Sequence, residues 1–350
     1  MKFVVNDVAA IQGGVYTILS DFYMDVLKND HENQWIFILA HKFFPESENV
    51  KIITRDDLKR SKVKKVIFEL FTGRKFINAF SPDVYISLQN IATFGIKAKY
   101  KIVYLHQPVP FIKNKKFNFF KKNERQLAFY QKIVGLIIKK SLHFVKPKVI
   151  VQTRWMKRAV IEQCKLRSDY ISVVHPQVIQ DNKTKYNGDG KEFFYPSSNY
   201  IYKNHQVIYK AIKLLNQKGI KDFCVKFTLS EDQLNYKENN IQYLGFLPRK
   251  EVMKMYNDNV LLFPSYMESF GLPLIEAALT ADIILAADTE FSRELLSTYK
   301  NVYFFKYNDY ERLAELMEKV IMGEIKSNGD KIHVQKNTRS VFCTISSLIN

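Results

Sequence analysis

The sequence predicts an α/β protein of two domains, each formed around a doubly wound parallel sheet. At 350 residues the chain is longer than one hydrophobic core usually supports. Short runs rich in Val, Ile, Phe and Tyr alternate with segments of helical periodicity, which is the arrangement of parallel sheets covered by helices on both faces. One long polar stretch near the middle of the chain separates five of these runs from five others.

The expected strands form one group in each half of the chain. They cover residues 2–6, 34–40, 83–88, 101–106 and 148–152 in the first half, and 223–229, 241–246, 259–264, 282–287 and 301–305 in the second. Five strands are enough for one doubly wound unit, and ligands of such sheets bind outside the carboxyl ends of the strands. We therefore expect the two units to face each other across a cleft that holds the site.

The polar stretch "QDNKTKYNGDGKE" is interpreted as the linker between the domains because it has two glycines and, apart from one tyrosine, no apolar residue. The predicted boundaries are residues 1–180 for the N-terminal domain, 181–192 for the linker and 193–325 for the C-terminal domain. Residues 326–350 are predicted to form a C-terminal segment, with a helix that packs back on the N-terminal domain.

The amino-acid composition indicates the kind of partner that the protein binds and the compartment in which it works. Lys and Arg outnumber Asp and Glu by 53 to 35, a net charge of +18, so an anionic partner is expected: nucleic acid, anionic lipid or a phosphorylated substrate. The three cysteines are widely spaced and show neither a disulfide framework nor a zinc motif, which favours a reducing cytoplasm. The N-terminus is unlike a signal peptide and no window approaches ~18 apolar residues. We expect a cytoplasmic protein, soluble or peripheral on the inner face of the membrane.

The stretch "SYMESFGLPLIEAA", Ser265–Ala278, joins an expected strand to a helix. Pro273 fits the first helical turn, where its missing N–H costs nothing. Glu268 then lies in the loop and Glu276 about one turn into the helix. The simplest interpretation is a solvated loop acid and a helix N-terminal charge. The alternative is a pair of carboxylates that hold one ligand, with Glu276 accepting two hydrogen bonds from a vicinal diol such as a ribose.

The segment "ESFGLPLIEA", preceded by "FPS" and followed by an apolar strand and "TEFSREL", closely resembles the donor-site signature of the retaining nucleotide-sugar glycosyltransferases of family four. That signature is a glutamate, seven residues and a second glutamate, and the aromatic, glycine, proline and alanine residues between the acids agree as well. The resemblance implies the GT-B fold, with an N-terminal Rossmann-like acceptor domain and a C-terminal Rossmann-like donor domain. It covers the C-terminal half closely and the N-terminal half mainly through two loops.

By this resemblance Glu276 holds the donor ribose. Glu268 and the loop after it hold the transferred sugar, and Glu268 also faces the positive charge that develops at the anomeric carbon. The donor-binding residues of this loop are Ser269, Phe270, Gly271 and Leu272.

A second feature is "YPSSNYIYKNHQVIYKAIKLL", in which a loop leads into a helix. Lys203 falls near the helix N-terminus, where an ammonium group and backbone N–H groups can together meet a diphosphate. In the family, "KN" marks the lysine that binds the leaving diphosphate, whereas an isolated lysine is usually a surface residue. The family's usual arginine is replaced by "SSN", so either Lys203 carries the anion largely alone or another arginine such as Arg249 assists.

Two loops of the N-terminal half complete the predicted site. Gly13 and Gly14 follow the first strand and open the first helix, as does the family's glycine-rich loop that packs against donor phosphates and acceptor. His106 follows the apolar run "KIVYL", where related enzymes place a histidine that contacts the transferred sugar; a structural histidine is the equal alternative. The predicted catalytic residues are Glu268, His106 and Lys203.

A local excess of positive charge occurs in "KNKKFNFFKKNER", followed by "YQKIVGLIIKKSLHF" with helical apolar spacing. This pattern suits an anionic membrane surface or a lipid-linked acceptor, with a solvated charged helix as the equal alternative. The predicted patch consists of Lys113, Lys115, Lys116, Phe117, Phe119, Phe120, Lys121 and Lys122.

These features predict a retaining hexosyltransferase that uses a UDP- or GDP-sugar and a saccharide or polyprenyl-linked saccharide acceptor, in bacterial capsule or lipopolysaccharide assembly. No Asp-x-Asp motif occurs, so neither a metal nor another cofactor is expected. The alternatives are a nucleotide-sugar epimerase or glycan phosphorylase of the same fold. A basic nucleic-acid-binding protein is a further alternative, but no zinc finger, RNP-like run or helix-turn-helix pattern supports it, and no nucleic acid partner is expected.

Overall fold

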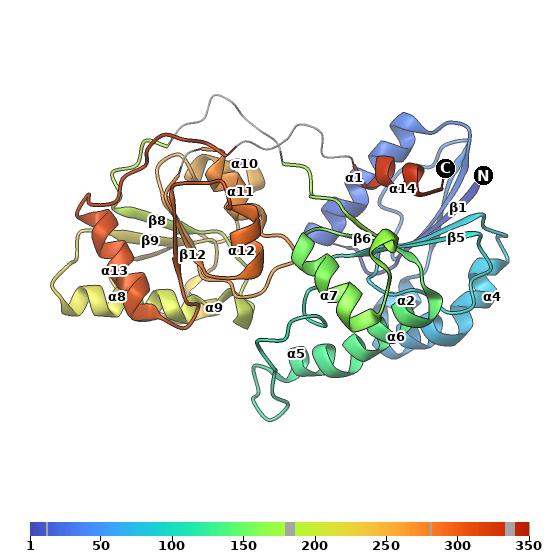
Figure 1. Cartoon of the computed structure of the whole chain (residues 1–350), viewed down its shortest axis with the longest axis horizontal. Helices are drawn as coiled ribbons and strands as arrows, with labels where there is room; N and C mark the ends of the chain where they lie inside the picture. Colours follow the sequence, from blue (N-terminus) through green and yellow to red (C-terminus); the bar gives the residue numbers. More distant parts are fainter. Residues whose placement is uncertain (12, 179–185, 281, 333–339, 350) are drawn as a thin grey trace. The chain divides into compact units, whose positions relative to one another are not determined.

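The computed structural model describes residues 1–11, 13–178, 186–280, 282–332 and 340–349. Its contacts divide the chain into two compact units, shown in Figure 1. Unit 1 comprises Met1–Gln177 and Asn337–Asn350, and unit 2 comprises Val178–Lys336. The α/β prediction is confirmed, because in both units the paired strands are parallel.

The sheet of unit 1, as far as the described residues show it, has seven parallel strands in the order β3-β2-β1-β4-β5-β6-β7. The strands are β1 (Lys2–Asp7), β2 (Gln34–Leu39), β3 (Val50–Thr54), β4 (Val84–Ser87), β5 (Tyr100–Leu105), β6 (Lys148–Val151) and β7 (Ile171–Val173). β3 and β7 escaped sequence analysis because both are short edge strands with several partly exposed residues.

Helices cover both faces of this sheet (Figure 1). They are α1 (Gly13–Asn29), α2 (Asp56–Arg60), α3 (Lys62–Ile67), α4 (Gly73–Asn78), α5 (Arg125–Phe129), α6 (Gly135–Val145), α7 (Arg154–Cys164) and α14 (Val341–Ile349), with the π-helical turns η1 (Phe68–Thr72) and η2 (Tyr130–Val134) and the 3₁₀ turn η3 (Ser168–Tyr170).

The C-terminal helix α14 belongs to unit 1. Its residues Phe342 and Ile345 join the core cluster that contains Trp35, and α14 also lies against α1. Burial of these apolar side chains, worth about 1.5–3 kcal/mol each when complete, explains why the chain returns to unit 1. The part of the predicted C-terminal segment from 326 to 336 is assigned instead to unit 2.

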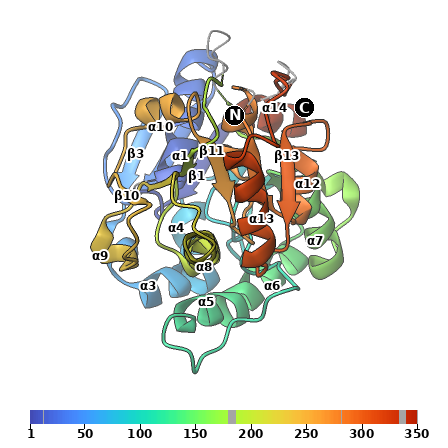
Figure 2. The ribbon, with the colours of Figure 1, turned by 90° about the vertical axis from the view of Figure 1, so that its left-hand side faces the viewer.

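The described residues of unit 2 form a six-stranded parallel sheet in the order β10-β9-β8-β11-β12-β13 (Figure 2 shows it from one end). The strands are β8 (Glu192–Tyr195), β9 (Cys224–Phe227), β10 (Ile241–Tyr243), β11 (Val260–Phe263), β12 (Ile284–Ala287) and β13 (Val302–Phe305). The helices are η4 (Ile201–Lys203, a 3₁₀ turn), α8 (His205–Gln217), α9 (Glu231–Leu234), α10 (Arg249–Met255), α11 (Leu272–Ala278), α12 (Glu290–Leu295) and α13 (Tyr310–Ile321).

The predicted linker, residues 181–192, lies partly outside the described residues. Its described part already packs in unit 2: the Tyr186 N–H donates to the Thr280 carbonyl at 2.7 Å, and Glu192 begins β8. β8 was missed as a strand because its four residues follow directly on the polar stretch, whereas its three buried aromatic residues place it at the centre of the sheet.

In the described part of the chain, no helix is sufficiently long and apolar to cross a bilayer.

Candidate functional site

The carboxyl ends of β8 and β11 adjoin at the centre of the unit 2 sheet. Successive strands run outward from β8 to β10, and the chain then returns to β11 on the other side of β8. The loops after β8 and β11 therefore diverge at a topological switch point, which is where doubly wound sheets bind their ligands. One of these loops leads into η4, which ends at Lys203, and the other contains Glu268.

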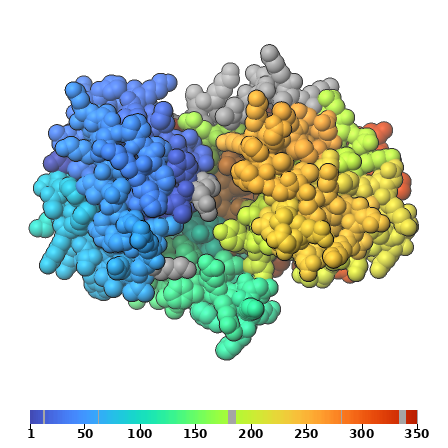
Figure 3. Space-filling model, turned by 180° about the vertical axis from the view of Figure 1, so that it is seen from behind, coloured from blue at the N-terminus to red at the C-terminus, as the bar shows by residue number. Residues whose placement is uncertain are grey.

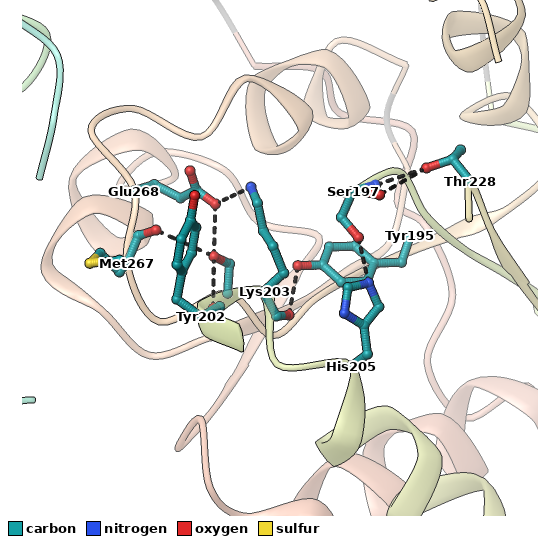
Figure 4. A network of polar contacts seen from close by, with 9 residues as sticks. Tyr195, Ser197, Tyr202, Lys203, His205, Thr228, Met267 and Glu268 are labelled. Carbon is teal, nitrogen blue, oxygen red and sulfur yellow. Dashed lines mark hydrogen bonds and ion pairs between the residues drawn. The ribbon is translucent and has the colours of Figure 1, made fainter. Parts of the chain in front are cut away.

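Lys203 and Glu268 form an ion pair across this switch point, 65 positions apart in sequence (Figure 4). Lys203 Nζ lies 2.5 Å from Glu268 Oε1, and each side chain is only 16% exposed. Ser265 Oγ donates to the same carboxylate oxygen at 2.7 Å. Because both contacts fall on Oε1, the second oxygen, Oε2, is the one suited to accept hydrogen bonds from a bound hydroxyl group.

A hydrogen-bonded network extends from Lys203 into the sheet (Figure 4). The Tyr195 hydroxyl, at the end of β8, donates to the Lys203 carbonyl at 2.8 Å. Ser197 follows β8, and its Oγ lies 2.7 Å from Nε2 of the buried His205 at the start of α8. The Ser197 N–H donates to Thr228 Oγ1 at 3.0 Å. The first contact holds the backbone at Lys203 and the other two hold Ser197 earlier in the same loop, so the loop that positions Lys203 is restrained at two points.

This network was not predicted from the sequence. Ser197 was interpreted only as part of the segment that replaces the family's arginine, and no role was predicted for Tyr195 or His205. The signal available was weak, because a serine and a histidine eight positions apart have no meaning until β8 and α8 are known to adjoin.

His205 makes stability depend on pH. Burial lowers its pKa from 6.5 to about 3, and the nearby charge of Lys203 lowers it further. As the pH falls below about 6.5, the unfolded chain therefore takes up a proton that the folded protein does not, and the free energy of unfolding decreases by up to about 1.4 kcal/mol per pH unit. We expect His205→Gln to lose less stability between pH 7 and pH 5 than the parent protein, as measured by urea denaturation.

His106 provides a second, independent test of this effect, because burial also lowers its pKa, to about 4. His106→Gln should flatten the pH dependence independently of His205→Gln, and the double variant should flatten it further. A His205→Gln protein with the same pH dependence as the parent would contradict a buried neutral His205.

Glu276 belongs to α11, and its side chain is only 7% exposed. Its Oε1 accepts from Arg249 at 2.9 Å and its Oε2 from the Tyr256 hydroxyl at 3.3 Å. Burial raises the pKa of Glu276, and the Arg249 charge opposes that rise. Arg249, which sequence analysis offered as a second cation for the diphosphate, therefore pairs with Glu276 in this structure. The side chain of Arg249 is 44% exposed, so it can turn toward solvent or a ligand.

The loop before α11 is shaped by Gly271, which has φ +105° and caps the helix. This left-handed conformation favours glycine, and an added Cβ would also lie 3.3 Å from a Leu274 methyl group. Phe270 and Gly271 are buried while Ser269 and Leu272 are partly exposed. The loop is thus held rigidly by packing at its centre.

In unit 1, two of the predicted residues begin α1 and the third follows β5. Gly13 and Gly14 begin α1, and a Cβ at Gly14 would meet no described heavy atom within 4 Å, so this surface is open. His106 follows β5; its backbone N–H donates to Asn90 Oδ1 at 2.7 Å, and its Nε2 lies 3.1 Å from the Leu88 carbonyl. The same Nε2 lies 3.2 Å from Asn90 Nδ2, so Leu88 and Asn90 together fix the orientation of the ring.

Only some residues of the predicted basic patch are exposed on the surface of unit 1. Phe117 is buried, 1% exposed, so the prediction that it faces a partner is corrected: its position in the chain gave no sign that the loop folds over it. Lys115 turns toward the buried Glu124, and Lys113 pairs with Glu162. Lys116, Phe119, Phe120, Lys121 and Lys122 are exposed.

No group of three or more His, Cys, Asp or Glu residues suited to a metal ion occurs among the described residues.

Residues 177–336 match the family model described as Glycosyl transferases group 1, and these are nearly the bounds of unit 2. The family match therefore covers unit 2, which is less than half of the chain. No curated protein matches this chain significantly.

Solved structures show that the fold is GT-B. HepE from Anabaena, in complex with UDP-glucose, superposes with a TM-score of 0.63 at 14% identity, covering 100% of this chain and 98% of that chain. The lipopolysaccharide outer core galactosyltransferase WaaB gives 0.62 at 14% identity, with 93% and 92% covered. TarM gives 0.51 at 17% identity and 69% coverage of this chain, which spans only 48% of TarM. The predicted fold class is thereby confirmed.

Proposed function

We propose that this glycosyltransferase transfers a sugar from a nucleoside diphosphate sugar to a saccharide acceptor, with retention of anomeric configuration. The observation that carries the proposal is the Lys203–Glu268 ion pair at the switch point of the unit 2 sheet. It unites the two charged residues that the family motif assigns to the leaving diphosphate and the transferred sugar.

Each charged group of the site has a role in binding the donor. The Lys203 ammonium exchanges Glu268 for the diphosphate, whose greater charge attracts it more strongly. Glu276 exchanges its contacts with Arg249 and Tyr256 for the ribose hydroxyls. Glu268 and the amides of Phe270, Gly271 and Leu272 then hold the sugar.

The reaction that fits these groups takes place on one face of the sugar. The bond between the anomeric carbon and the diphosphate oxygen breaks while the acceptor oxygen forms a bond to that carbon, and the acceptor proton passes to a diphosphate oxygen. No protein base is then required. Lys203 stabilises the charge on the leaving group, and Glu268 faces the positive charge at the anomeric carbon. No metal ion enters this scheme.

Unit 1 is proposed to bind the acceptor, with His106 contacting the transferred sugar and the Gly13–Gly14 turn approaching the donor phosphates. Comparison supports a surface glycan as the product class, since WaaB is a lipopolysaccharide galactosyltransferase and WaaG is involved in lipopolysaccharide biosynthesis. HepE was solved with UDP and with UDP-glucose, which supports a uridine donor over a guanosine donor. The proposed acceptor is a saccharide or a polyprenyl-linked saccharide.

Nucleoside diphosphates provide the first test. We expect UDP to raise the melting temperature of the protein, because a ligand at about 100 times its Kd adds roughly 2.7 kcal/mol to the free energy of unfolding. GDP tests the alternative base, and EDTA should leave both the shift and the turnover unchanged. Glu276→Gln is the matched control and should show a smaller shift at the same UDP concentration.

Three kinds of result would contradict the proposed transferase activity. Absence of a shift with UDP, GDP and their common sugar forms would overturn the proposal, and binding of an oligonucleotide with a steep salt dependence would favour the nucleic-acid alternative. An isomerised donor would indicate an epimerase, and released UDP without a glycosylated acceptor would indicate hydrolysis of the donor by water. The anomeric proton coupling in the purified product decides between retention and inversion.

A further inference from the structure

Two tyrosines just before Lys203 form a parallel stacked pair in the loop after β8. The ring centroids of Tyr200 and Tyr202 lie 5.3 Å apart, and the two ring planes differ by 6°. Tyr202 is partly buried, whereas Tyr200 is exposed. Among the described residues, Tyr202 alone supplies a ring contact to Tyr200. A ligand can therefore reach the other face of the Tyr200 ring, which we call its outer face.

The inner ring of this pair, Tyr202, adjoins the candidate site. Lys203 Nζ lies 5.8 Å from the Tyr202 ring centroid, and Figure 4 shows the Tyr202 ring beside Glu268. Burial and the negative charge of Glu268 raise the pKa of the Tyr202 hydroxyl, which therefore stays neutral. Exposure increases from the ion pair to the outer ring: the Lys203 and Glu268 side chains are each 16% exposed, and Tyr200 is 56% exposed. The tyrosine pair thus leads from the buried charges to the surface of unit 2.

Backbone hydrogen bonds hold the tyrosine pair in place. The Tyr202 carbonyl accepts from the Tyr266 N–H at 3.1 Å and from Ser265 Oγ at 3.3 Å. The Lys203 N–H donates to the Tyr200 carbonyl at 2.9 Å. These bonds join η4 to the loop after β11, so the two rings keep their position relative to the ion pair. A rigid aromatic side chain that is already in place loses little conformational entropy when it binds a ligand.

Polar groups accompany the exposed ring. Ser198 and Asn199 precede Tyr200 and are exposed as well. Asn199 Nδ2 donates to the Gln233 carbonyl at 2.6 Å, which fixes the amide and leaves Oδ1 to accept a hydrogen bond from a ligand. An aromatic face with a hydroxyl and an amide beside it suits a sugar ring, which has an apolar C–H face and hydroxyl groups around its edge. An anion suits it less well, because the face of an aromatic ring carries partial negative charge.

We propose that the outer face of Tyr200 stacks on a sugar ring of the saccharide acceptor. The inference rests on the proposed function, which places the diphosphate at Lys203 and the transferred sugar at Glu268. The buried ion pair suits the reacting parts of the donor, from which water must be excluded. The exposed Tyr200 suits a glycan that continues into solvent.

A nucleobase also has a face that can stack on tyrosine, but its place in the donor is wrong for Tyr200. The ribose and the diphosphate separate the base from the transferred sugar. The proposed ribose ligand, Glu276, is bonded to Arg249 and Tyr256, whereas the tyrosine pair adjoins Lys203 and Glu268. The pair therefore belongs to the end of the donor at which the acceptor reacts.

Calorimetric titration with simple glycosides tests the inference. The probes are the methyl glycosides of glucose, galactose, mannose and N-acetylglucosamine, added to protein saturated with UDP. For the glycoside that the parent binds most tightly, Tyr200→Ala should weaken binding by about tenfold, the loss expected for a stacked ring. Tyr200→Phe keeps the aromatic face and should stay within about twofold of the parent. The control variant, Tyr236→Ala, should bind as the parent does. It breaks another parallel pair of unit 2, Tyr209 and Tyr236, with centroids 4.2 Å apart, and the segment after α9 belongs to the yellow-to-orange surface of unit 2 in Figure 3.

A fluorescent variant locates the contact directly. The emission of Tyr200→Trp should change when that glycoside is added and should not change with UDP alone. Equal losses in Tyr200→Phe and Tyr200→Ala would overturn the inference, because they would indicate a role of the hydroxyl group. Weaker binding of UDP or UDP-glucose by Tyr200→Ala would also overturn it, since the ring would then contact the donor, and so would a parent protein that binds none of the glycosides. The increase in melting temperature with UDP tests the proposed function separately, so that function can hold while this inference fails.

Discussion

Lys203→Met is expected to lower kcat by about a hundredfold or more, because a group that stabilises charge in the transition state typically contributes 10²–10³-fold. Lys203 is the cation that the structure places on Glu268 at the switch point. The substitution removes the charge that would otherwise meet the leaving diphosphate, and it leaves the 16%-exposed Glu268 carboxylate without its partner. Turnover at saturating donor, measured as released nucleoside diphosphate, is the readout.

A double variant distinguishes catalysis from structure. Lys203→Met combined with Glu268→Gln removes both charges, so the melting temperature lost in the single variant should largely return. If the pair binds the donor and stabilises the transition state, activity should stay low in the double variant. Recovery of activity together with stability would show that the ion pair is only structural. The control variant, Lys191→Met, breaks an exposed ion pair with Asp222 in the same unit and should leave kcat unchanged.

Glu276→Gln is expected to weaken donor binding by roughly tenfold to a hundredfold, since a hydrogen bond to a charged group is worth about 1.5–3 kcal/mol. The carboxylate lies between Arg249 and Tyr256, and its proposed ligand is the ribose diol. The effect should fall on KM and on the Kd for UDP more than on kcat, because the ribose is bound equally in the ground state and the transition state.

A modified nucleotide makes this test specific to the ribose. The parent protein should bind 2′-deoxy-UDP more weakly than UDP, whereas Glu276→Gln should discriminate little between them, giving a positive coupling energy in the double cycle. Full discrimination by Glu276→Gln would place the ribose elsewhere. Arg249→Gln is the companion variant, and it should alter the stability of the apo protein more than the preference between the two nucleotides.

The fold could be predicted from alternating runs because strands buried on both faces must be apolar, and β11 and β12 are buried along their whole length. The same argument failed for β3, with exposed or partly exposed residues, and for β8, whose four residues follow a polar stretch. Edge strands and very short strands carry too few buried positions to produce a recognisable pattern. The described residues just before β8, such as Tyr186, already pack in unit 2.

The residues of the candidate site also fall into two groups, those predicted from local spacing and those brought together only by tertiary contacts. Glu268, Gly271 and Glu276 stand within nine consecutive residues, so their spacing is a local property that the sequence displays directly. Lys203 was assigned through a local "KN" pattern, but its contact with Glu268 spans 65 positions. The Ser197–His205 bond and the pairing of Arg249 with Glu276 depend on which elements adjoin.

By itself, the sequence determined the two-unit α/β architecture, the loop that holds the two glutamates and the excess of positive charge. These properties depend on residue types and on short spacings. Only the tertiary structure decided which charges meet, because Lys203, Glu268 and Ser265 come together through the return of the chain to β11 beside β8. It also decided which residues of the basic segment are exposed: Phe117 is buried and Phe120 is not, since burial depends on how a loop packs over its neighbours.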